Sequence, residues 1–527
     1  MPPRASSPRG EVEPSSSPRP STPRLSAGVI PYRSAPDGTC EIFWVHRSES
    51  LRFMGGWHAF PGGRLSETDG AVPATGSVDG SDAYNRSGQP APHTACALRE
   101  LFEETGILAV LGRLPSVGEL DRARDQLLAD TLDFGAWLRS HALALDASRL
   151  RFAGRWVTPP LSPVRFDATF FLLEWERDEV SQPAVIPGEL ESGEWIRADE
   201  ALLRWDQGDV LLAQPTLETI RVLAEHGPDG RDLLWRSQSH QPNSPHSIEF
   251  RPGIRAIPLE ARTLPPATHT NAMLVGSSEL VAIDPGSPLP EAQRRLAEIV
   301  DEEAQRTGGR LCGIWLTHHH EDHVGGVEAL RRQFDVPVWA HPSTAARLAK
   351  AGLRIDRRFE GGELVTLAGS PPLRIRVLHT PGHASGHLCF FEERTLTLLC
   401  GDMLSGYGTV VINPPDGSMI EYLESLERMA GLGARVILPS HGTMMRDARK
   451  ALMAARKHRL WREDRVFDAW QAGQREPAAM LDTVYDEIDP RARPLAVRQV
   501  IAHLERLEAV GRIPPLPAEI RVQLGRG

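Results

Sequence analysis

Histidine and aspartate gather in the segment 317–326, which reads THHHEDHVGG. The segment follows the apolar run LCGIWLT and precedes a helical pattern, VEALRRQF. Imidazole and carboxylate groups bind divalent metals, and a site with an open coordination position can activate water. His318 and His320, two residues apart at a strand end, can address one metal, while Asp322 and His323 can address a second. The spacing therefore predicts hydrolytic metal chemistry.

Three further candidate ligands lie downstream, each at the end of an apolar strand. They are His383 in TPGH, Asp402 in CGD and His441 in PSHG. Strand ends converge on one edge of an α/β sheet, so these side chains can meet the segment 317–326. We expect a two-metal site in which Asp402 bridges the metals. The remaining ligands are His318, His320 and His383 for one metal, and Asp322, His323 and His441 for the other.

Asp322 has a second expected role, because a carboxylate beside the metals can orient the attacking water. The ligand types suit zinc, iron or manganese, and zinc is the expectation for both positions. Four nearby histidines have no metal role in this pattern, and we expect them to support the ligands or the fold. They are His319, His341, His379 and His387.

A second group of candidate residues lies on the helical stretch 99–107, RELFEETGI. Glu100, Glu103 and Glu104 stand at i, i+3 and i+4, so three carboxylates share one helix face. Like charges at this spacing destabilise a helix unless a cation lies between them. Mg²⁺ or Mn²⁺, which prefer oxygen ligands, would relieve the repulsion and could bind a diphosphate. We expect all three glutamates to hold metal, Glu103 and Glu104 to be catalytic, and Arg99 to pair with one carboxylate.

The elements that position these side chains need more than one hydrophobic core, because 527 residues exceed the usual size of a single domain. Five scattered cysteines without C-x-x-C spacing are typical of reduced thiols in the cytoplasm. No run of about 18 apolar residues occurs, so we expect no membrane span. The net charge of −10 gives no general attraction to nucleic acid, so an RNA partner would need a local basic surface.

Composition divides the chain into five parts. A start rich in Pro, Ser and Arg cannot bury enough apolar surface to fold. Two regions alternate strands with helices, a polar and turn-rich stretch separates them, and a helical region follows. The expected parts are a disordered tail at 1–24, an α/β domain at 25–226, a linker at 227–250, a second α/β domain at 251–446 and a helical module at 447–527.

The motif H-x-H-x-D-H, followed by separate His, Asp and His, resembles the metallo-β-lactamase superfamily over roughly residues 255–446. The resemblance implies an αββα sandwich, and Asp402 in the bridging place is similar to the hydrolase branches of that superfamily. Two branches stay open. TPGH followed by SGH is similar to glyoxalase-II-like thioester hydrolases. CGDMLSGYGTVVINPPDGSMIEYLESL is similar to the β-lactamase-like protein 2 group, which implies phosphodiesterase or endoribonuclease activity.

The helical module favours the second branch, because it resembles the winged-helix extension of that group. Its helical patterns occupy 447–472, 477–487 and 494–510. Single-stranded RNA would explain its basic residues, although interleaved acidic residues are equally typical of a solvated helical cap. The basic residues are Lys457, Arg459, Arg462, Arg465, Arg498 and Arg506, and the acidic ones are Glu463, Asp464, Glu505 and Glu508.

The acidic helix and the upstream FPGG at 60–63 resemble a Nudix box within residues 25–225, which implies an α/β/α sandwich. Arg99 follows Gly63 by 36 residues, so about twenty-two residues are inserted relative to the usual box. Glu67 and Asp69 are the nearest matches for a box carboxylate that the insertion displaces.

The residues ahead of FPGG are similar to the coenzyme A diphosphatase signature, with RS at 47–48, then Arg52 and Gly56 in matching places. The leading residues of that signature are absent and are replaced by FWV at 43–45. The resemblance implies that Arg47 and Arg52 bind the phosphates of coenzyme A or another nucleotide. Ordinary surface arginines are the alternative.

These resemblances predict a two-site, metal-dependent hydrolase with an α/β multidomain fold. The N-terminal site would cleave a nucleoside diphosphate derivative such as coenzyme A or its esters. The C-terminal site would be a phosphodiesterase or endoribonuclease, with a glyoxalase-II-like thioester hydrolase as the alternative. A further hypothesis is a regulatory protein whose Nudix half senses a nucleotide without cleaving it.

Overall fold

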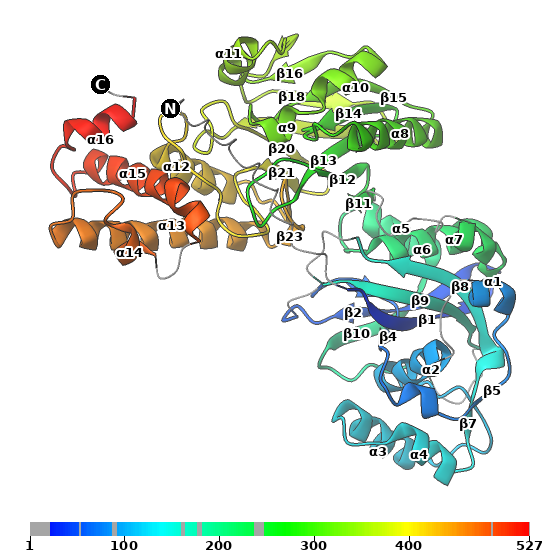
Figure 1. Cartoon of the computed structure of the whole chain (residues 1–527). Coiled ribbons are helices and arrows are strands. Elements are labelled where there is room, and N and C mark those ends of the chain that lie inside the picture. The colour runs from blue at the N-terminus through cyan, green and yellow to red at the C-terminus, as the bar shows by residue number, and fades with distance from the viewer. Residues whose placement is uncertain are drawn as a thin grey trace, which may run out of the picture.

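The computed structural model describes residues 22–51, 54–86, 92–159, 164–176, 182–236, 247–485 and 489–525. Within these ranges an N-terminal part, residues 22–236, is followed by a central part, residues 247–446, and by a group of C-terminal helices. Figure 1 shows the N-terminal part and the C-terminal helices on different sides of the central part.

A mixed sheet forms the middle of the N-terminal part, with the strand order β10-β2-β1-β9-β8. Its long strands are β1 (Arg24–Ser34), β2 (Cys40–Arg47), β8 (Leu150–Val157), β9 (Phe166–Glu174) and β10 (Leu190–Arg197). Short β3 (His58–Ala59) pairs with β2, and β4 (Gly62–Arg64) pairs with β1. A small separate sheet holds β5 (Ala74–Thr75), β6 (Val110–Leu111) and β7 (Ala144–Asp146).

Helices cover both faces of the N-terminal sheet, because successive side chains of a strand point to opposite faces. On β1, Val29 packs with α2 (Pro92–Thr105), whereas Ile30 packs with α5 (Ala198–Asp206) and α6 (Gln214–His226). The shorter helices are α1 (Ser81–Arg86), α3 (Val117–Leu128), α4 (Phe134–Ser140) and α7 (Asp232–Arg236). The sheet therefore lies between two helical layers.

Two stacked sheets form the central part. The first sheet holds β11 (Ile248–Arg251), β12 (Ile254–Glu260), β13 (His269–Gly276), β14 (Glu279–Ile283), β15 (Arg310–Trp315), β16 (Val338–Ala340) and β17 (Arg357–Arg358). The second holds β18 (Leu364–Leu367), β19 (Leu373–His379), β20 (Leu388–Glu392), β21 (Thr397–Gly401), β22 (Val436–Pro439) and β23 (Met445–Arg446). The main helices are α8 (Pro290–Thr307), α10 (Val327–Phe334), α11 (Pro342–Lys350) and α12 (Met419–Ala430).

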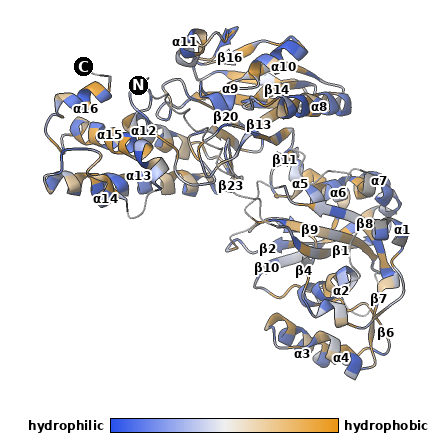
Figure 2. Ribbon diagram, in the orientation of Figure 1, coloured by the Kyte–Doolittle hydropathy of each residue, from blue (hydrophilic) through white to orange (hydrophobic). Residues whose placement is uncertain are grey.

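Alternating burial along the strands builds three hydrophobic layers in the central part. Leu280 of β14 packs with α8, while Val281 packs between the two sheets. In the second sheet, Phe390 faces the layer between the sheets and Phe391 faces α12. Figure 2 shows hydrophilic and hydrophobic residues alternating along the outer helix α8. The order of layers is helix, sheet, sheet, helix, which is the predicted αββα arrangement.

The C-terminal helices are α13 (Ala448–Gln471), α14 (Leu481–Val484), α15 (Arg493–Ala509) and α16 (Ala518–Gln523). Each of the three helical patterns in the sequence corresponds to one helix, with α15 starting one residue earlier than predicted, while α16 was not predicted. Val466, Trp470, Val500 and Leu504 belong to a hydrophobic core of this part. The start of α13 packs on the central part, since Leu452 belongs to the same core as α12.

The segment predicted as a linker, 227–250, contains folded elements. It includes α7 and β11, and β11 pairs with β12. The structure describes only the two ends of this segment, since 237–246 lie outside the described residues. Within the described ranges, no helix combines the length and apolar character needed to cross a membrane.

The N-terminal and central parts share a packed junction. Trp57 and Leu211 are buried in the core between the two central sheets. Arg446 of β23 donates to Glu49 O at 3.3 Å and lies against Gly56. Gly56 has φ +70°, and a Cβ there would lie 1.8 Å from Arg446 Nη1, so this contact requires glycine.

We expect Trp57→Ala to lower the free energy of unfolding by about 3 kcal/mol, because it removes a large buried side chain and leaves a cavity at the junction. Urea unfolding followed by circular dichroism measures the change. Trp461→Ala is the matched control, since that residue is 45% exposed and its loss should change stability little. An equal effect of both substitutions would contradict a structural role for Trp57.

Candidate functional site

The seven predicted metal ligands all lie at the ends of strands or in the turns that follow them. His318 and His320 follow β15, and His323 lies in the short helix α9 (Glu321–Val324) with Asp322. The other ligands follow the second sheet. His383 comes after β19, Asp402 directly after β21 and His441 shortly after β22. The two sheets therefore deliver ligands to one shared edge.

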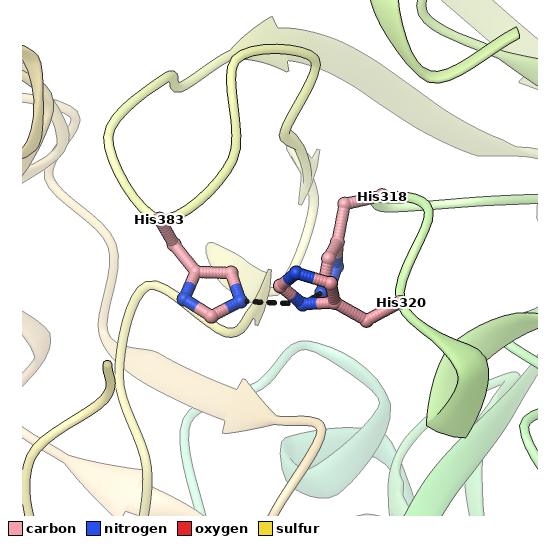
Figure 3. Close-up of side chains that lie close together, drawn as sticks. All are labelled: His318, His320 and His383. Carbon is pink, nitrogen blue, oxygen red and sulfur yellow. Dashed lines mark hydrogen bonds between the residues drawn. The ribbon is translucent and has the colours of Figure 1, made fainter. Parts of the chain in front are cut away.

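Three imidazoles form the first ligand group, His318, His320 and His383. His318 Nε2 lies 2.8 Å from His320 Nδ1, and His383 Nε2 lies 3.0 Å from the same atom. Figure 3 shows the three rings turned toward one another from separate segments. Burial, together with neighbouring histidines, lowers the pKa of His320 to about 3. A neutral imidazole offers a lone pair, which is the form that binds a metal.

The second ligand group holds Asp322, His323 and His441. His441 Nε2 lies 3.4 Å from Asp322 Oδ2, and His323 Nε2 lies 3.7 Å from Asp322 Oδ1. Asp402 lies between the two groups. Its Oδ1 is 3.4 Å from His441 Nε2 and 3.5 Å from His323 Nε2, while its Oδ2 is 3.7 Å from His383 Nε2. One carboxylate thus has an oxygen toward each group.

The donor set fits divalent metals. His323 Nε2 and Asp402 Oδ1 are buried and have no hydrogen-bond partner, so both atoms are available to a metal in the shared space. Burial opposes the charged carboxylate, yet His441 and His323 hold the pKa of Asp402 well below its ordinary value. Imidazole nitrogen and carboxylate oxygen in this ratio are typical zinc ligands.

Asp284, at the end of β14, supports the site and was missed in the sequence. Its Oδ2 accepts a hydrogen bond from His323 Nδ1 at 2.8 Å, and its Oδ1 accepts from Thr317 N at 2.8 Å. A carboxylate on the far nitrogen of a ligating histidine fixes the tautomer and raises the basicity of the metal-facing nitrogen. The signal was available, because the motif IDPG places an acidic residue at another strand end.

We expect Asp284→Asn to weaken zinc binding by roughly 10–100-fold, since it removes the charged acceptor of His323 Nδ1 at constant volume. Competition between the protein and a chelator for Zn²⁺ measures the affinity. Asp468→Asn on the exposed surface of α13 is the control. Wild-type affinity in Asp284→Asn would show that Asp284 only holds the backbone of Thr317.

Two other ligands are oriented by backbone carbonyls. His441 Nδ1 donates to His269 O at 2.9 Å, and His383 Nδ1 donates to Val411 O at 2.7 Å. His387 lies beside the ligands, and its Nε2 accepts from Asp402 N at 3.1 Å. The two carbonyl contacts leave Nε2 of His441 and Nε2 of His383 facing the space between the ligand groups.

The three histidines His319, His341 and His379 lie around the site without joining a ligand group. His319 Nε2 is 3.6 Å from Asp416 Oδ2. The rings of His341 and His379 stack with centroids 4.1 Å apart, and His379 Nε2 donates to Ser385 O at 3.0 Å. They therefore contact the loops that carry the ligands.

In the N-terminal part, α2 carries the three predicted glutamates beside Arg99. Arg99 Nη1 donates to Glu100 Oε1 at 2.8 Å and to Glu103 Oε2 at 3.3 Å, which confirms that Arg99 pairs with these carboxylates. Asp69 is buried and accepts from Arg99 Nε at 2.8 Å, whereas Glu67 is exposed. Glu67 and Asp69 were the two candidates for the Nudix-box carboxylate displaced by the insertion. Of these, Asp69 is the one that contacts α2.

Burial and mutual repulsion raise the pKa of these glutamates. The pKa of Glu100 is raised to about 7, chiefly by burial, and the pKa of Glu104 is raised well above its ordinary value by burial and by Glu100. Among the described residues, the groups of three ligand atoms within 4.8 Å of one another all lie in the central part, so these glutamates do not form one. Arg99 occupies part of the space between Glu100 and Glu103.

The glycines of FPGG let β4 approach α2 closely. Gly62 N donates to Glu104 Oε2 at 2.9 Å. A Cβ at Gly63 would lie 2.4 Å from Glu100 Cδ, so a larger residue there would displace the Glu100 carboxylate. The motif therefore positions two of the three glutamates.

Arg47, predicted to bind phosphate, lies close to the acidic helix. Its Nη2 donates to Glu189 Oε1 at 2.9 Å, and its charge lowers the pKa of Glu104 against the larger effect of burial. Glu189 was not a candidate in the sequence, yet it raises the pKa of Glu103. Arg52 lies outside the described residues.

Five of the six basic residues expected to meet RNA have intramolecular partners. Arg459 is buried and donates to Val410 O, and Arg498 Nε donates to Asn413 Oδ1 at 2.7 Å. The other three also bond within the tail: Arg462 to Val484 O, Arg465 to Thr483 O and Arg506 to Glu463. Of these five arginines, Arg459 is buried and Arg506 pairs with a carboxylate, so these two do not offer a free charge to RNA.

Known proteins match the central part and the tail. Residues 265–441 match the metallo-beta-lactamase superfamily, and residues 477–514 match the beta-lactamase associated winged helix domain. A beta-lactamase-like protein 2 homolog of Drosophila melanogaster is 28% identical over 46% of this chain and 84% of the relative. An atrochrysone carboxyl ACP thioesterase of Aspergillus chevalieri is 30% identical over 42% of this chain and 66% of the relative.

A solved structure also shows similarity to part of the chain. It is a Nudix hydrolase from Alicyclobacillus acidocaldarius, 29% identical, with a TM-score of 0.33, and the match covers 38% of this chain and 91% of that chain.

The matches and the metal-ligand geometry define a hydrolase. More particularly, the chain contains a metallo-β-lactamase domain followed by a β-lactamase-associated winged helix domain.

Proposed function

We propose that the metallo-β-lactamase domain hydrolyses thioesters of pantetheine, the group shared by acyl-coenzyme A and acyl carrier proteins. The observation that carries the hydrolytic part is Asp402, whose two oxygens face two different ligand groups and so suit a bridging role. Relatives named as acyl carrier protein thioesterases support the thioester. The coenzyme A-type signature at 47–63 supports a pantetheine-bearing substrate.

The chain's own residues supply most of this mechanism. Two divalent metals, zinc by ligand type, would be held by the seven predicted ligands and would supply an activated water and an electrophile for the carbonyl oxygen. Asp322 would orient that water. Asp284, His269 and Val411 fix the ligand imidazoles through Nδ1. Their orientation is set before substrate arrives, which lowers the reorganisation that the reaction needs.

Phosphodiesterase or endoribonuclease activity, the expectation that the tail suggested in the sequence, receives less support. It needs a basic surface for the RNA backbone. Arg459, Arg498 and Arg506 are instead bound to protein acceptors. Cleavage of single-stranded RNA is therefore kept as an outcome of the test.

For the N-terminal part, we propose a Nudix-type diphosphatase that cleaves coenzyme A or its esters. Glu100, Glu103 and Glu104 would hold Mg²⁺ or Mn²⁺, and the raised pKa of buried Glu100 is what a cation-binding carboxylate would show before a cation arrives. Arg47 would meet a phosphate. Domains of 25–226, 251–446 and 447–527 stay part of this proposal, although α7 extends the folded N-terminal part to Arg236 and β11 begins the central sheet at Ile248. Unpaired cysteines support a reducing compartment such as the cytoplasm.

The test is a paired hydrolysis assay on the purified full-length protein. One arm offers acyl-coenzyme A, an acyl carrier protein thioester, S-lactoylglutathione, coenzyme A and ADP-ribose, and the other offers single-stranded RNA. Wild type and Asp322→Ala are compared. Thioester cleavage that Asp322→Ala loses is the expected result. RNA cleavage lost in the same variant, with thioesters untouched, would replace the thioesterase by a nuclease.

A further inference from the structure

The C-terminal helices hold a loop of the metallo-β-lactamase domain. This loop, residues 403–417, leads from Asp402 to α12. Arg459 of α13 and Gln499 of α15 are both buried, and both donate to the same loop carbonyl, Val410 O. The Gln499 Nε2 bond measures 3.1 Å. Two helices of the tail thus fix one peptide group.

The next carbonyl in the loop contacts a predicted metal ligand. Val411 O accepts from His383 Nδ1 at 2.7 Å. A neutral imidazole has one N–H, so this bond leaves the lone pair on Nε2, which faces His320. Figure 3 shows this Nε2 directed at the other two rings. The orientation of His383 therefore depends on where the backbone at Val410 and Val411 lies.

Further contacts join the tail to both ends of the same loop. The guanidinium of Arg459 lies 5.4 Å from the centre of the Tyr422 ring, and Tyr422 OH donates to Met403 O at 2.8 Å, next to Asp402. At the other end, Arg498 Nε donates to Asn413 Oδ1 at 2.7 Å. The loop is thus held at its start, middle and end.

We propose that the tail is a structural part of the metal centre, in which Arg459 and Gln499 act as positioning residues for His383 through Val410 and Val411. The inference rests on the metal site proposed above. It gives the C-terminal helices a function that needs no nucleic-acid partner. Removing either donor leaves the Val410 carbonyl with one hydrogen bond in place of two, so the loop loosens and His383 leaves its metal-facing orientation for part of the time.

The test measures Zn²⁺ affinity by competition with a chelator, in full-length wild type, Arg459→Met and Gln499→Met. We expect affinity to fall by roughly 10–100-fold in Arg459→Met, the range for groups that orient a metal ligand, and by less in Gln499→Met. The visible absorption of bound Co²⁺ should change in both, because the coordination geometry changes. Arg465→Met is the matched control, as Arg465 lies on the same helix and donates to Thr483 O at the surface.

The outcomes separate the tail from the metal site. Wild-type Zn²⁺ affinity and Co²⁺ spectra in folded Arg459→Met and Gln499→Met would overturn the positioning role and leave the metal site standing. A wild type that binds no Zn²⁺ would overturn the metal site and this inference together. Circular dichroism of the metal-free variants reports folding, and Gln499→Met decides the question if Arg459→Met unfolds.

Discussion

Asp402→Ala should reduce thioester hydrolysis by at least roughly 100-fold, because a direct ligand should matter more than the outer groups that cost about 10–100-fold. The carboxylate lies between both ligand groups, with Oδ1 toward His323 and His441 and Oδ2 toward His383. Without it, the five ligand histidines would keep Asp322 as the single carboxylate of the predicted ligand set, and that residue contacts His323 and His441. The measurements are kcat and the zinc content per chain by atomic absorption.

The bridging role of Asp402 is tested by measuring how much of the activity lost in Asp402→Ala is due to missing metal and how much to slower turnover. We expect fewer zinc ions per chain as well as a lower kcat, since both ligand groups lose one donor. Asp301→Ala, on the exposed face of α8, is the control and should match wild type. Full zinc content with an unchanged kcat would show that Asp402 only accepts hydrogen bonds beside the ligands and does not bridge two metals.

Much of the candidate metal site could be predicted from the sequence, because its residues stand at predictable places. The end of an apolar strand such as LCGIWLT or LTLLCGD can be located in the sequence, because the apolar run stops there. A polar residue at that end is expected to lie at the edge of the sheet. His318, His383 and Asp402 could thus be expected together before any contact was known. The same reasoning would have found Asp284, had the strand before IDPG been treated in the same way.

Other features depend on tertiary contacts that no local pattern records. Asp69 meets Arg99 across an insertion of Pro-, Gly- and Ser-rich residues, and spacing along the chain does not reveal this pair. Arg459 looked like a cation for RNA, because a charged residue on a polar helix is usually exposed. Its burial against Val410 follows from how α13 docks beside α12, which is set by side chains distant in sequence.

The N-terminal part has the second large expected effect. Glu104→Gln should lower Mg²⁺-dependent diphosphate cleavage by roughly 100-fold or more, because it removes a charge that a clamped metal needs. Glu104 accepts from Gly62 N, and burial together with Glu100 raises its pKa well above the ordinary value. Glutamine keeps the shape and the acceptor. A loss of diphosphate cleavage in Glu104→Gln would therefore reflect the missing negative charge and not a folding defect.

The design separates the two sites, since they lie in different parts of the chain. Release of the nucleotide from coenzyme A is measured with Mg²⁺, and thioester cleavage is measured on the same preparations. Glu104→Gln should lose the first and keep the second, while Glu67→Gln, on an exposed residue, should keep both. If wild type binds Mg²⁺ and nucleotide without cleaving them, the N-terminal part is a sensor. In that case the ion pairs of Arg99 with Glu100 and Glu103 would be the resting state of a binding site. A nucleotide should then change the rate of thioester hydrolysis through the junction at Trp57 and Arg446.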